Sequence, residues 1–168
     1  MEQIEIERKY LIRMPDAALL SRLPASEIEQ VYILSSDGSR ERVRRRAYAE
    51  GTVFTHTSKQ RLSALSQVEK EREISEERFR EFLSQADPMR RPVRKKRYIY
   101  EFDGQSFEID VYPFWDDRAL MELELESEDQ EIRLPPGIEI VREVSFDKRY
   151  SNSAIAREIP RESLEKEV

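Results

Sequence analysis

Several residue types that often carry a protein's chemistry are scarce or absent in this chain. None of its 168 residues is a cysteine, which excludes disulfide bonds and thiolate zinc sites. The one histidine, His56, has the strand phase opposite to Lys59, which predicts a position on the surface or in a packed shell. We find no signal-peptide pattern and no apolar run long enough to cross a membrane, so we expect a cytoplasmic protein with no membrane partner.

Charge, in contrast, is abundant. Asp, Glu, Lys and Arg make up 38% of the residues, well above the roughly 25% of an ordinary globular domain. Disorder could explain such a composition, but the charges alternate with an equal 38% of hydrophobic residues, which favours folded strands. Basic residues cluster at 40–46 and at 90–97, yet the net charge of −6 opposes nucleic-acid binding, so we expect no nucleic-acid partner.

The stretch 4–10, Ile-Glu-Ile-Glu-Arg-Lys-Tyr, has the alternation of a β-strand. Because residues two apart share one face of a strand, Glu5, Glu7 and Lys9 project together. Two carboxylates about 4 Å apart repel each other by roughly 4 kcal/mol at an effective dielectric of about 20. A divalent cation would remove that repulsion, since hard cations prefer oxygen ligands. For one strand alone a solvated face is the simpler explanation, so recurrence of the pattern decides between the two.

The same alternation recurs along the chain and predicts one domain built mainly of strands, at 1–158, followed by a polar tail at 159–168. The expected strands are 4–10, 29–34, 40–48, 52–60, 68–74, 94–101, 105–112, 120–126 and 138–146. The expected helices are 15–20, 76–86 with Ser75 as N-cap, 128–134 and 151–158. Turn residues are expected at 36–38, 50–51 and 103–104.

Strands that carry charge on one face and apolar residues on the other can close into a barrel whose interior is a charged tunnel. Such an interior is costly unless its charges pair or bind ions. Arg and Lys suit a ligand with several phosphates, and carboxylates suit Mg²⁺ or Mn²⁺, so together they predict phosphoryl-transfer chemistry. The basic residues are Lys9, Arg42, Arg44, Lys59, Lys95 and Arg97, and the carboxylates are Glu5, Glu7, Glu122 and Glu124.

The ordered series of motifs resembles the CYTH superfamily, the triphosphate tunnel metalloenzymes. The strand Glu5-Ile6-Glu7-Arg8-Lys9 matches the E-x-E-x-K signature of that family. The later matching stretches, in family order, are 42–44, Lys59, 69–71, 95–98, 107–111, 121–125 and 143–152. The resemblance spans nearly the whole chain. It implies an α+β fold, an eight-stranded antiparallel β-barrel that forms a tunnel, with helices packed outside.

The resemblance also implies a role for each charged residue. Glu5, Glu7, Glu122 and Glu124 would hold the metal, with Asp110 assisting. Lys9, Arg42, Arg44, Lys59 and Arg97 would bind phosphates. Lys95, paired with Tyr32, would activate water, and a lysine can act as a base only if its pKa is depressed. Arg94 and Arg97 are the neighbours expected to depress it.

We therefore expect a divalent-metal-dependent hydrolase of a triphosphate, with Mg²⁺ or Mn²⁺ as cofactor and inorganic tripolyphosphate as substrate. Three alternatives stay open: a class IV adenylate cyclase that converts ATP to cyclic AMP and pyrophosphate, a thiamine triphosphatase, and a non-catalytic polyphosphate-binding module. The outer barrel face could pair two chains into a homodimer, and the sequence leaves the oligomeric state open.

The remaining notable residues are expected on the surface, in the core or at the tunnel rim. Strand phase predicts surface positions for Arg45, Arg46, Arg91 and Lys96. Core packing is expected for Phe79, Phe82 and Leu83, and packing on the barrel for Trp115. Lys148 and Arg149 either reach the tunnel or cap the last strand.

Overall fold

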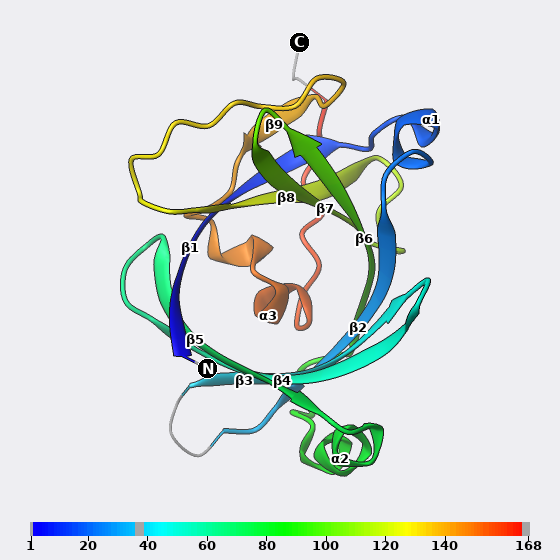
Figure 1. The fold of residues 1–168 in the computed structure, drawn as a ribbon, viewed down its shortest axis with the longest axis vertical. Helices are drawn as coiled ribbons and strands as arrows, with labels where there is room; N and C mark the ends of the chain where they lie inside the picture. Colours follow the sequence, from blue (N-terminus) through cyan, green and yellow to red (C-terminus); the bar gives the residue numbers. More distant parts are fainter. Residues whose placement is uncertain (1, 36–38, 166–168) are drawn as a thin grey trace.

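The structure, a computed structural model, describes residues 2–35 and 39–165, so the turn predicted at 36–38 lies outside the described residues. Within the described part, eight strands close into an antiparallel barrel, and a ninth, short strand pairs with β1 beyond the point where β1 leaves β5 (Figure 1). The strand order is β5-β4-β3-β2-β6-β7-β8-β1-β9, and a further pairing of β1 with β5 closes the ring. These features confirm the predicted α+β class and eight-stranded barrel.

The elements follow the alternating pattern closely. The strands are β1 (Glu2–Arg13), β2 (Ala25–Ile33), β3 (Arg40–Tyr48), β4 (Gly51–Arg61), β5 (Ser66–Ile74), β6 (Val93–Phe102), β7 (Gln105–Val111), β8 (Arg118–Leu125) and β9 (Ile140–Glu143). The helices are α1 (Ala17–Leu20), α2 (Glu76–Phe82) and α3 (Asn152–Ile155), with 3-10 helices η1 (Leu83–Gln85) and η2 (Lys148–Tyr150). The tight turn between β6 and β7 requires positive φ, which Asp103 (49°) and Gly104 (75°) adopt.

The long strand β1 closes the barrel because it pairs with three neighbours. One edge pairs with β8, which places Glu7 opposite Glu124 and Lys9 opposite Glu122. The other edge pairs with β5 along residues 2–6 and then with β9 along 10–12. Since side chains alternate along each strand, every second residue of β1 points into the ring.

The outer face of β2, β3 and β4 is covered by α2. Ser75 caps this helix, as predicted, by accepting a hydrogen bond from the backbone N–H of Arg78 at 3.0 Å. Phe79 and Phe82 pack in a buried cluster on this face. The prediction that Leu83 belongs to the same core is wrong: the α-helix ends at Phe82, a 3-10 turn follows, and Leu83 is 38% exposed.

His56 takes the packed position that its strand phase predicts. Its ring stacks on Phe82, with centroids 5.0 Å apart, beneath α2. Its Nε2 atom lies 3.0 Å from the carboxylate of Glu41. His56 therefore supports the outer shell of the barrel and does not reach the interior.

An irregular segment at 126–139 covers another part of the outer face. A helix is predicted at 128–134, and that prediction is wrong: the segment has one turn-type backbone bond, from the N–H of Gln130 to the carbonyl of Ser127, and further along its backbone bonds to the side chain of Gln105. The Gln105 side chain donates to the carbonyl of Glu131 at 2.8 Å and accepts from the N–H of Arg133 at 2.9 Å. Ile132 then packs with the apolar outer residues of the barrel.

The C-terminal part is less regular than predicted. A strand is expected at 138–146 and a helix at 151–158, but β9 ends at Glu143 and α3 contains four residues. Between them the chain leaves the wall and turns into the barrel. Figure 1 shows α3 inside the ring, whereas α1 and α2 lie outside it, so the expected outside packing holds for α1 and α2 alone.

An apolar cluster inside the ring explains this inward turn. Tyr150 and Ile155 are 0% and 2% exposed and pack with Leu11, which points inward from β1. Trp115 belongs to the same cluster, and its Nε1–H donates to the carbonyl of Pro160 at 3.0 Å. Burial of a large apolar side chain stabilises a fold by about 1.5–3 kcal/mol, so this packing holds the segment inside the barrel. The predicted polar tail from 159 onward thus begins with packed residues.

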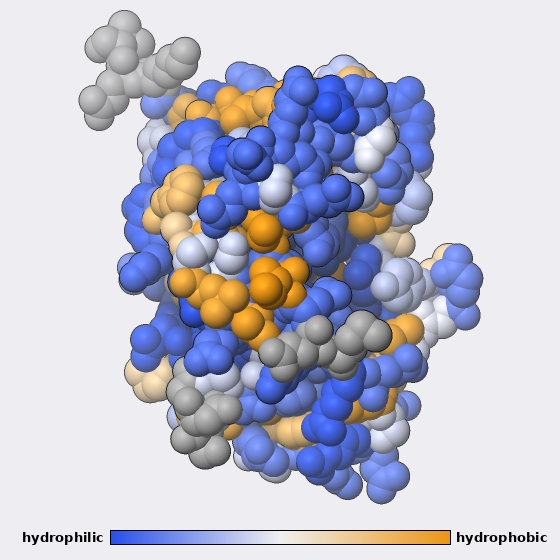
Figure 2. Space-filling model, turned by 60° about the vertical axis from the view of Figure 1, so that its left-hand side comes forward, coloured by the Kyte–Doolittle hydropathy of each residue, from blue (hydrophilic) through white to orange (hydrophobic). Residues whose placement is uncertain are grey.

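The outer surface carries much of the charge that the composition shows. The face seen in Figure 2 is mostly hydrophilic, with apolar residues gathered near its middle. No helix in the described part of the chain is long and apolar enough to span a membrane.

Candidate functional site

The inward charged residues line one cavity of about 530 Å³. Residues of the C-terminal segment form one side of this cavity. Most predicted site residues line it: Glu5, Glu7, Lys9, Tyr32, Arg42, Arg44, Lys59, Arg97, Glu122 and Glu124. Lys95 and Asp110 are buried behind this surface, with side chains 0% and 3% exposed. Further charged residues that are not among the predicted site residues also line the cavity: Arg40, Arg46, Arg61, Glu69, Glu71, Glu108 and Asp147.

A basic wall forms one side of the cavity. The arginines at alternate positions 40–46 of β3 project inward beside Lys59 of β4. Arg46 is among them, so its predicted surface position is wrong; it has the same strand phase as Arg42 and Arg44. Burial and the charge of Arg42 lower the pKa of Arg44 to about 9. Nε–H groups of Arg42 and Arg44 are buried without a partner among the described residues, so this wall has donors available for an anion.

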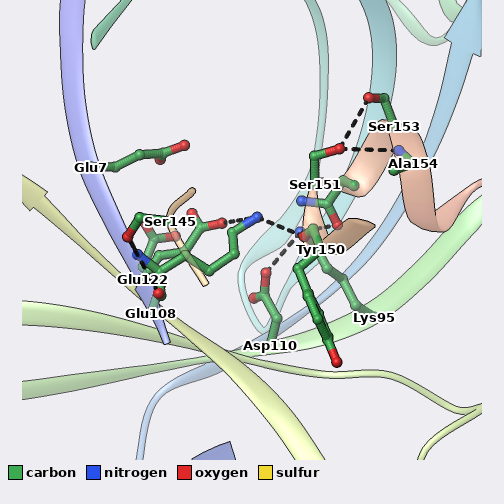
Figure 3. A network of polar contacts seen from close by, with 12 residues as sticks. Glu7, Lys95, Glu108, Asp110, Glu122, Ser145, Tyr150, Ser151, Ser153 and Ala154 are labelled. Carbon is green, nitrogen blue, oxygen red and sulfur yellow. Dashed lines mark hydrogen bonds and ion pairs between the residues drawn. The ribbon is translucent and has the colours of Figure 1, made fainter. Parts of the chain in front are cut away.

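An acidic wall, formed by Glu5 and Glu7 of β1 and Glu122 and Glu124 of β8, completes the site. The charge of Glu122, together with burial, raises the pKa of Glu7 to about 7. Burial opposes ionisation of Glu122, but Lys9, whose Nζ lies 3.0 Å away, lowers its pKa to about 2. Figure 3 shows Glu7, Glu108 and Glu122 on the same side of the site, away from Lys95.

These carboxylates have the chemistry of a divalent-cation site. Their donor atoms are all oxygens, and a hard cation would relieve the repulsion between Glu7 and Glu122. Among the described residues, no group of three histidine or acidic side chains is arranged to hold an ion by itself. Glu5 instead lies 3.2 Å from the Nζ of Lys59. The carboxylates therefore have the donor chemistry that a divalent cation prefers, without a preformed set of three among the described side chains.

Lys95 lies in a buried ionic cluster behind the cavity surface. Its Nζ is 2.7 Å from Asp110, which also accepts two hydrogen bonds from Arg97 at 2.8 and 2.9 Å. Burial lowers the pKa of Lys95 to about 7; Asp110 opposes this shift, and Arg97 and Arg44 add to it. Burial inside the barrel thus supplies the depressed pKa that a lysine base requires.

The surroundings of Lys95 differ from expectation at Arg94, and they include Asp110 as an ionic partner. Arg94 is expected to depress the lysine pKa, but Arg94 points outward and pairs with Glu29 at 2.8 Å, and Arg44 acts in its place. Burial opposes ionisation of Asp110, yet cationic side chains bonded to both of its oxygens hold its pKa well below the usual range. Asp110 therefore orients the cations around it, and its assisting role in metal binding stays a prediction.

The tyrosine in contact with Lys95 is Tyr112, whereas Tyr32 is the one predicted to pair with it. The ammonium group lies 5.8 Å from the centroid of the Tyr112 ring. The Oδ1 atom of Asn152 accepts hydrogen bonds from Lys95 at 3.4 Å and from the Tyr112 hydroxyl at 2.7 Å. Tyr32 lines the cavity, where its hydroxyl accepts from the amide of Gln30 at 3.4 Å. Asn152 lines the cavity as well, so its side chain connects Lys95 to the cavity wall.

The C-terminal segment supplies part of the cavity wall. The ammonium of Lys9 donates to the backbone carbonyl of Tyr150 at 3.1 Å, which ties the segment to β1 (Figure 3). Lys148 lines the cavity, whereas the guanidinium of Arg149 pairs with Asp147 at 2.7 Å. Of the two residues whose place the sequence leaves open, Lys148 reaches the cavity and Arg149 stays at its edge.

Comparisons with known proteins agree over nearly the full chain. No family model matches. The chain is 36% identical, over 159 residues, to an inorganic triphosphatase from Nitrosomonas europaea, covering 93% of this chain and 99% of the relative. A crystal structure of an inorganic triphosphatase matches with a TM-score of 0.59 at 34% identity, over 93% of this chain and 96% of that one. A protein from Pyrococcus horikoshii OT3, 16% identical, has the same fold with a TM-score of 0.54 over 74% of this chain and 80% of its own.

Proposed function

Because the chain belongs to the CYTH superfamily of triphosphate tunnel metalloenzymes, we propose that it is a divalent-metal-dependent hydrolase of inorganic tripolyphosphate. The basic and acidic walls that share one cavity are the observation that carries this proposal. A triphosphate needs cationic donors for its own charge, and a metal bound to it needs carboxylate oxygens. A cavity with either wall alone would suit an anion or a cation, but not their complex.

The basic wall would bind the phosphates. Alternate residues on a strand are about 7 Å apart, so Arg42 and Arg44 can address different phosphoryl groups. Their buried Nε–H groups without partners support this role. Lys9, Lys59 and Arg97 line the same cavity, where each would give up part of its contact with a carboxylate to a phosphate oxygen.

The acidic wall would hold Mg²⁺ or Mn²⁺. Metal dependence is general among triphosphatases of this superfamily. The oxygen donors of Glu5, Glu7, Glu122 and Glu124 suit either ion. The pKa of Glu7 is raised by the nearby charge of Glu122, a repulsion that a bound cation would relieve. When bound, the ion would neutralise phosphate charge and polarise the phosphoryl group.

Lys95 is the residue we propose as the base. A water oxygen would bond to the terminal phosphorus while the bond to the bridging oxygen breaks, which yields phosphate and pyrophosphate. The neutral amine of Lys95 would take the proton, and a pKa of about 7 leaves a useful neutral fraction near neutral pH. Lys95 is fully buried and bonds to the cavity-lining Asn152, so this transfer requires local side-chain movement that opens Lys95 to the cavity.

One observation favours a substrate with an organic group, such as ATP or thiamine triphosphate. Phe146 lines the cavity and is 63% exposed, in a position where a flat ring could stack on it. The rest of the lining is mostly charged, and this supports the unsubstituted triphosphate as the first candidate.

The substrate is tested by incubating the protein with tripolyphosphate, thiamine triphosphate and ATP, each with Mg²⁺ or Mn²⁺. We expect phosphate and pyrophosphate from tripolyphosphate, without cyclic AMP from ATP. Cyclic AMP and pyrophosphate from ATP would instead identify a cyclase. Binding of all three without turnover would leave a polyphosphate-binding module. EDTA should stop the reaction, and turnover that persists in EDTA would contradict the metal assignment.

The cytoplasmic location and the homodimer stay predictions. Sedimentation of the full chain at several concentrations would determine the oligomeric state.

A further inference from the structure

Gln67 lies at the seam between the basic and the acidic wall. In the ring, β5 stands between β4 and β1, and Gln67 of β5 is opposite Arg61 on one side and Glu5 on the other. The residue lines the cavity but is only 6% exposed, so its amide is almost completely withdrawn from solvent. A buried amide at this place must find its hydrogen-bond partners among the charged groups around it.

The amide of Gln67 bonds to both walls. Its Nε2 donates to Glu5 at 2.9 Å and to Glu7 at 3.5 Å. Its Oε1 accepts from the guanidinium of Arg40 at 3.0 Å. The partners determine which end of the Gln67 amide carries the oxygen, because carboxylates need hydrogen-bond donors and a guanidinium can only donate. One uncharged side chain thus connects two carboxylates with one arginine.

We propose that Gln67 is a positioning residue that holds Glu5 and Glu7 for the metal and Arg40 for the anion, so that metal and triphosphate bind in one fixed relation. The inference rests on the proposed function in one respect, namely that Glu5 and Glu7 bind the metal.

The uncharged amide is essential to this role. A lysine at position 67 would neutralise the carboxylates and compete with the metal, and a glutamate would add a third negative charge beside them. An amide donates to Glu5 and Glu7 and leaves their charge for the ion. Side chains that orient metal-binding carboxylates in this way commonly raise metal affinity by about 10–100-fold.

Two other buried glutamines provide matched controls. Gln30, 0% exposed on β2, accepts from the guanidinium of Arg44 at 3.0 Å and so contacts the basic wall alone. Gln105, 5% exposed on β7, has side-chain hydrogen bonds to the backbone of the outer segment 126–139, and among the described residues it has none to either wall. Replacing each by Met keeps the length of the side chain and removes the same hydrogen bonds.

The test compares Gln67→Met, Gln30→Met and Gln105→Met by calorimetric titration. Each variant is titrated with Mn²⁺ alone and, in EDTA, with tripolyphosphate alone, and its melting temperature is measured. We expect Gln67→Met to weaken both affinities, that for Mn²⁺ by about tenfold. Gln30→Met should weaken only tripolyphosphate binding. Gln105→Met should lower the melting temperature and leave both affinities unchanged.

An unchanged Mn²⁺ affinity in Gln67→Met would overturn the proposal, and so would equal weakening in all three variants or absence of Mn²⁺ binding by the unmodified protein. If Met at position 67 prevents folding, Gln67→Asn, Gln30→Asn and Gln105→Asn keep the amide and shorten its reach, with the same order of effects expected. These titrations need no turnover. Weakened Mn²⁺ binding in a protein that leaves tripolyphosphate intact would therefore support the role of Gln67 and contradict the proposed hydrolysis.

Discussion

Along the inward face of β1, Glu7 and Lys9 line the cavity, whereas Leu11, two residues further, lies in the apolar cluster around α3. The inward face of β8 changes in the same way, from Glu122 to Leu120. We call the part of the interior around the cavity the open half and the part around α3 the sealed half. Because the same strands build both halves, the inward side chains change from charged to apolar between one inward position and the next.

The two halves differ in what they contribute to the protein. In the open half the charge of Glu122 and burial raise the pKa of Glu7, and burial together with the charge of Arg42 lowers that of Arg44. Such contacts between like charges destabilise the unliganded fold. The sealed half packs Tyr150 and Ile155 with almost no exposed area, which stabilises it. Packing in the sealed half therefore offsets the stability that the open half loses by keeping charges in place for its ligands.

The largest effect is expected in the open half, on activity. Glu7→Gln should lower turnover of tripolyphosphate by about 10³-fold, roughly 4 kcal/mol of transition-state stabilisation, because a metal ligand is lost. Steady-state kinetics at saturating Mn²⁺ would measure this. Glu126→Gln is the matched control, since Glu126 is exposed beyond the end of β8 and should retain wild-type turnover. Full activity of Glu7→Gln would show that the open half does not bind the metal as proposed.

The next effect is expected in the sealed half, on stability. Ile155→Ala should lower the free energy of unfolding by about 3 kcal/mol, because a buried aliphatic side chain is replaced by a cavity. Chemical denaturation would measure this, with the 64% exposed Ile4→Ala as a control expected to change little. Turnover of folded Ile155→Ala should fall far less than turnover of Glu7→Gln, because Ile155 packs in the apolar cluster and does not itself line the cavity. A loss of turnover as large as that in Glu7→Gln would mean that the two halves do not act separately.

The smallest effect is a pH dependence of stability in the open half. The pKa of Glu7 is raised from 4.5 to about 7 in the folded protein, so the fold binds a proton that the unfolded chain has already released. Stability from this group is therefore lost as pH rises from 4.5 towards 7. In EDTA, the stability of Glu7→Gln relative to wild type should grow by about 1–3 kcal/mol over this range. Thermal melts at several pH values would test this, and a constant difference would contradict the like-charge contact.

Much of the fold follows from local pattern. The alternation with period two predicts the strands and the inward charged face, because a one-residue shift would turn the whole apolar set to the wrong side. The helix at 128–134 is predicted wrongly because side-chain bonds from Gln105, distant in sequence, fix that backbone. Leu83 is misassigned because a 3-10 turn breaks the helical spacing.

The candidate site is predictable to the same extent. Charged residues in strand phase identify both walls, whereas Gln30, Gln67 and Asn152 carry no charge and no periodicity that would single them out. Their roles arise from neighbours on other strands, such as Arg40 and Glu5 for Gln67. The partner of Lys95 is missed for the same reason, since Asn152 reaches it only through the inward turn of the C-terminal segment.

By itself, the sequence determined the strands, most of the predicted residues that face the interior, and that charges of both signs gather there. The tertiary structure alone decided that Tyr150 and Ile155 pack into the interior, and that Lys95 bonds to Asn152. The physical reason is that alternation is a local property of each strand. The packing of the sealed half depends on apolar burial between segments far apart in sequence, as between Leu11 and Tyr150. A hydrogen bond from Lys9 to the carbonyl of Tyr150, across 141 positions, adds to it.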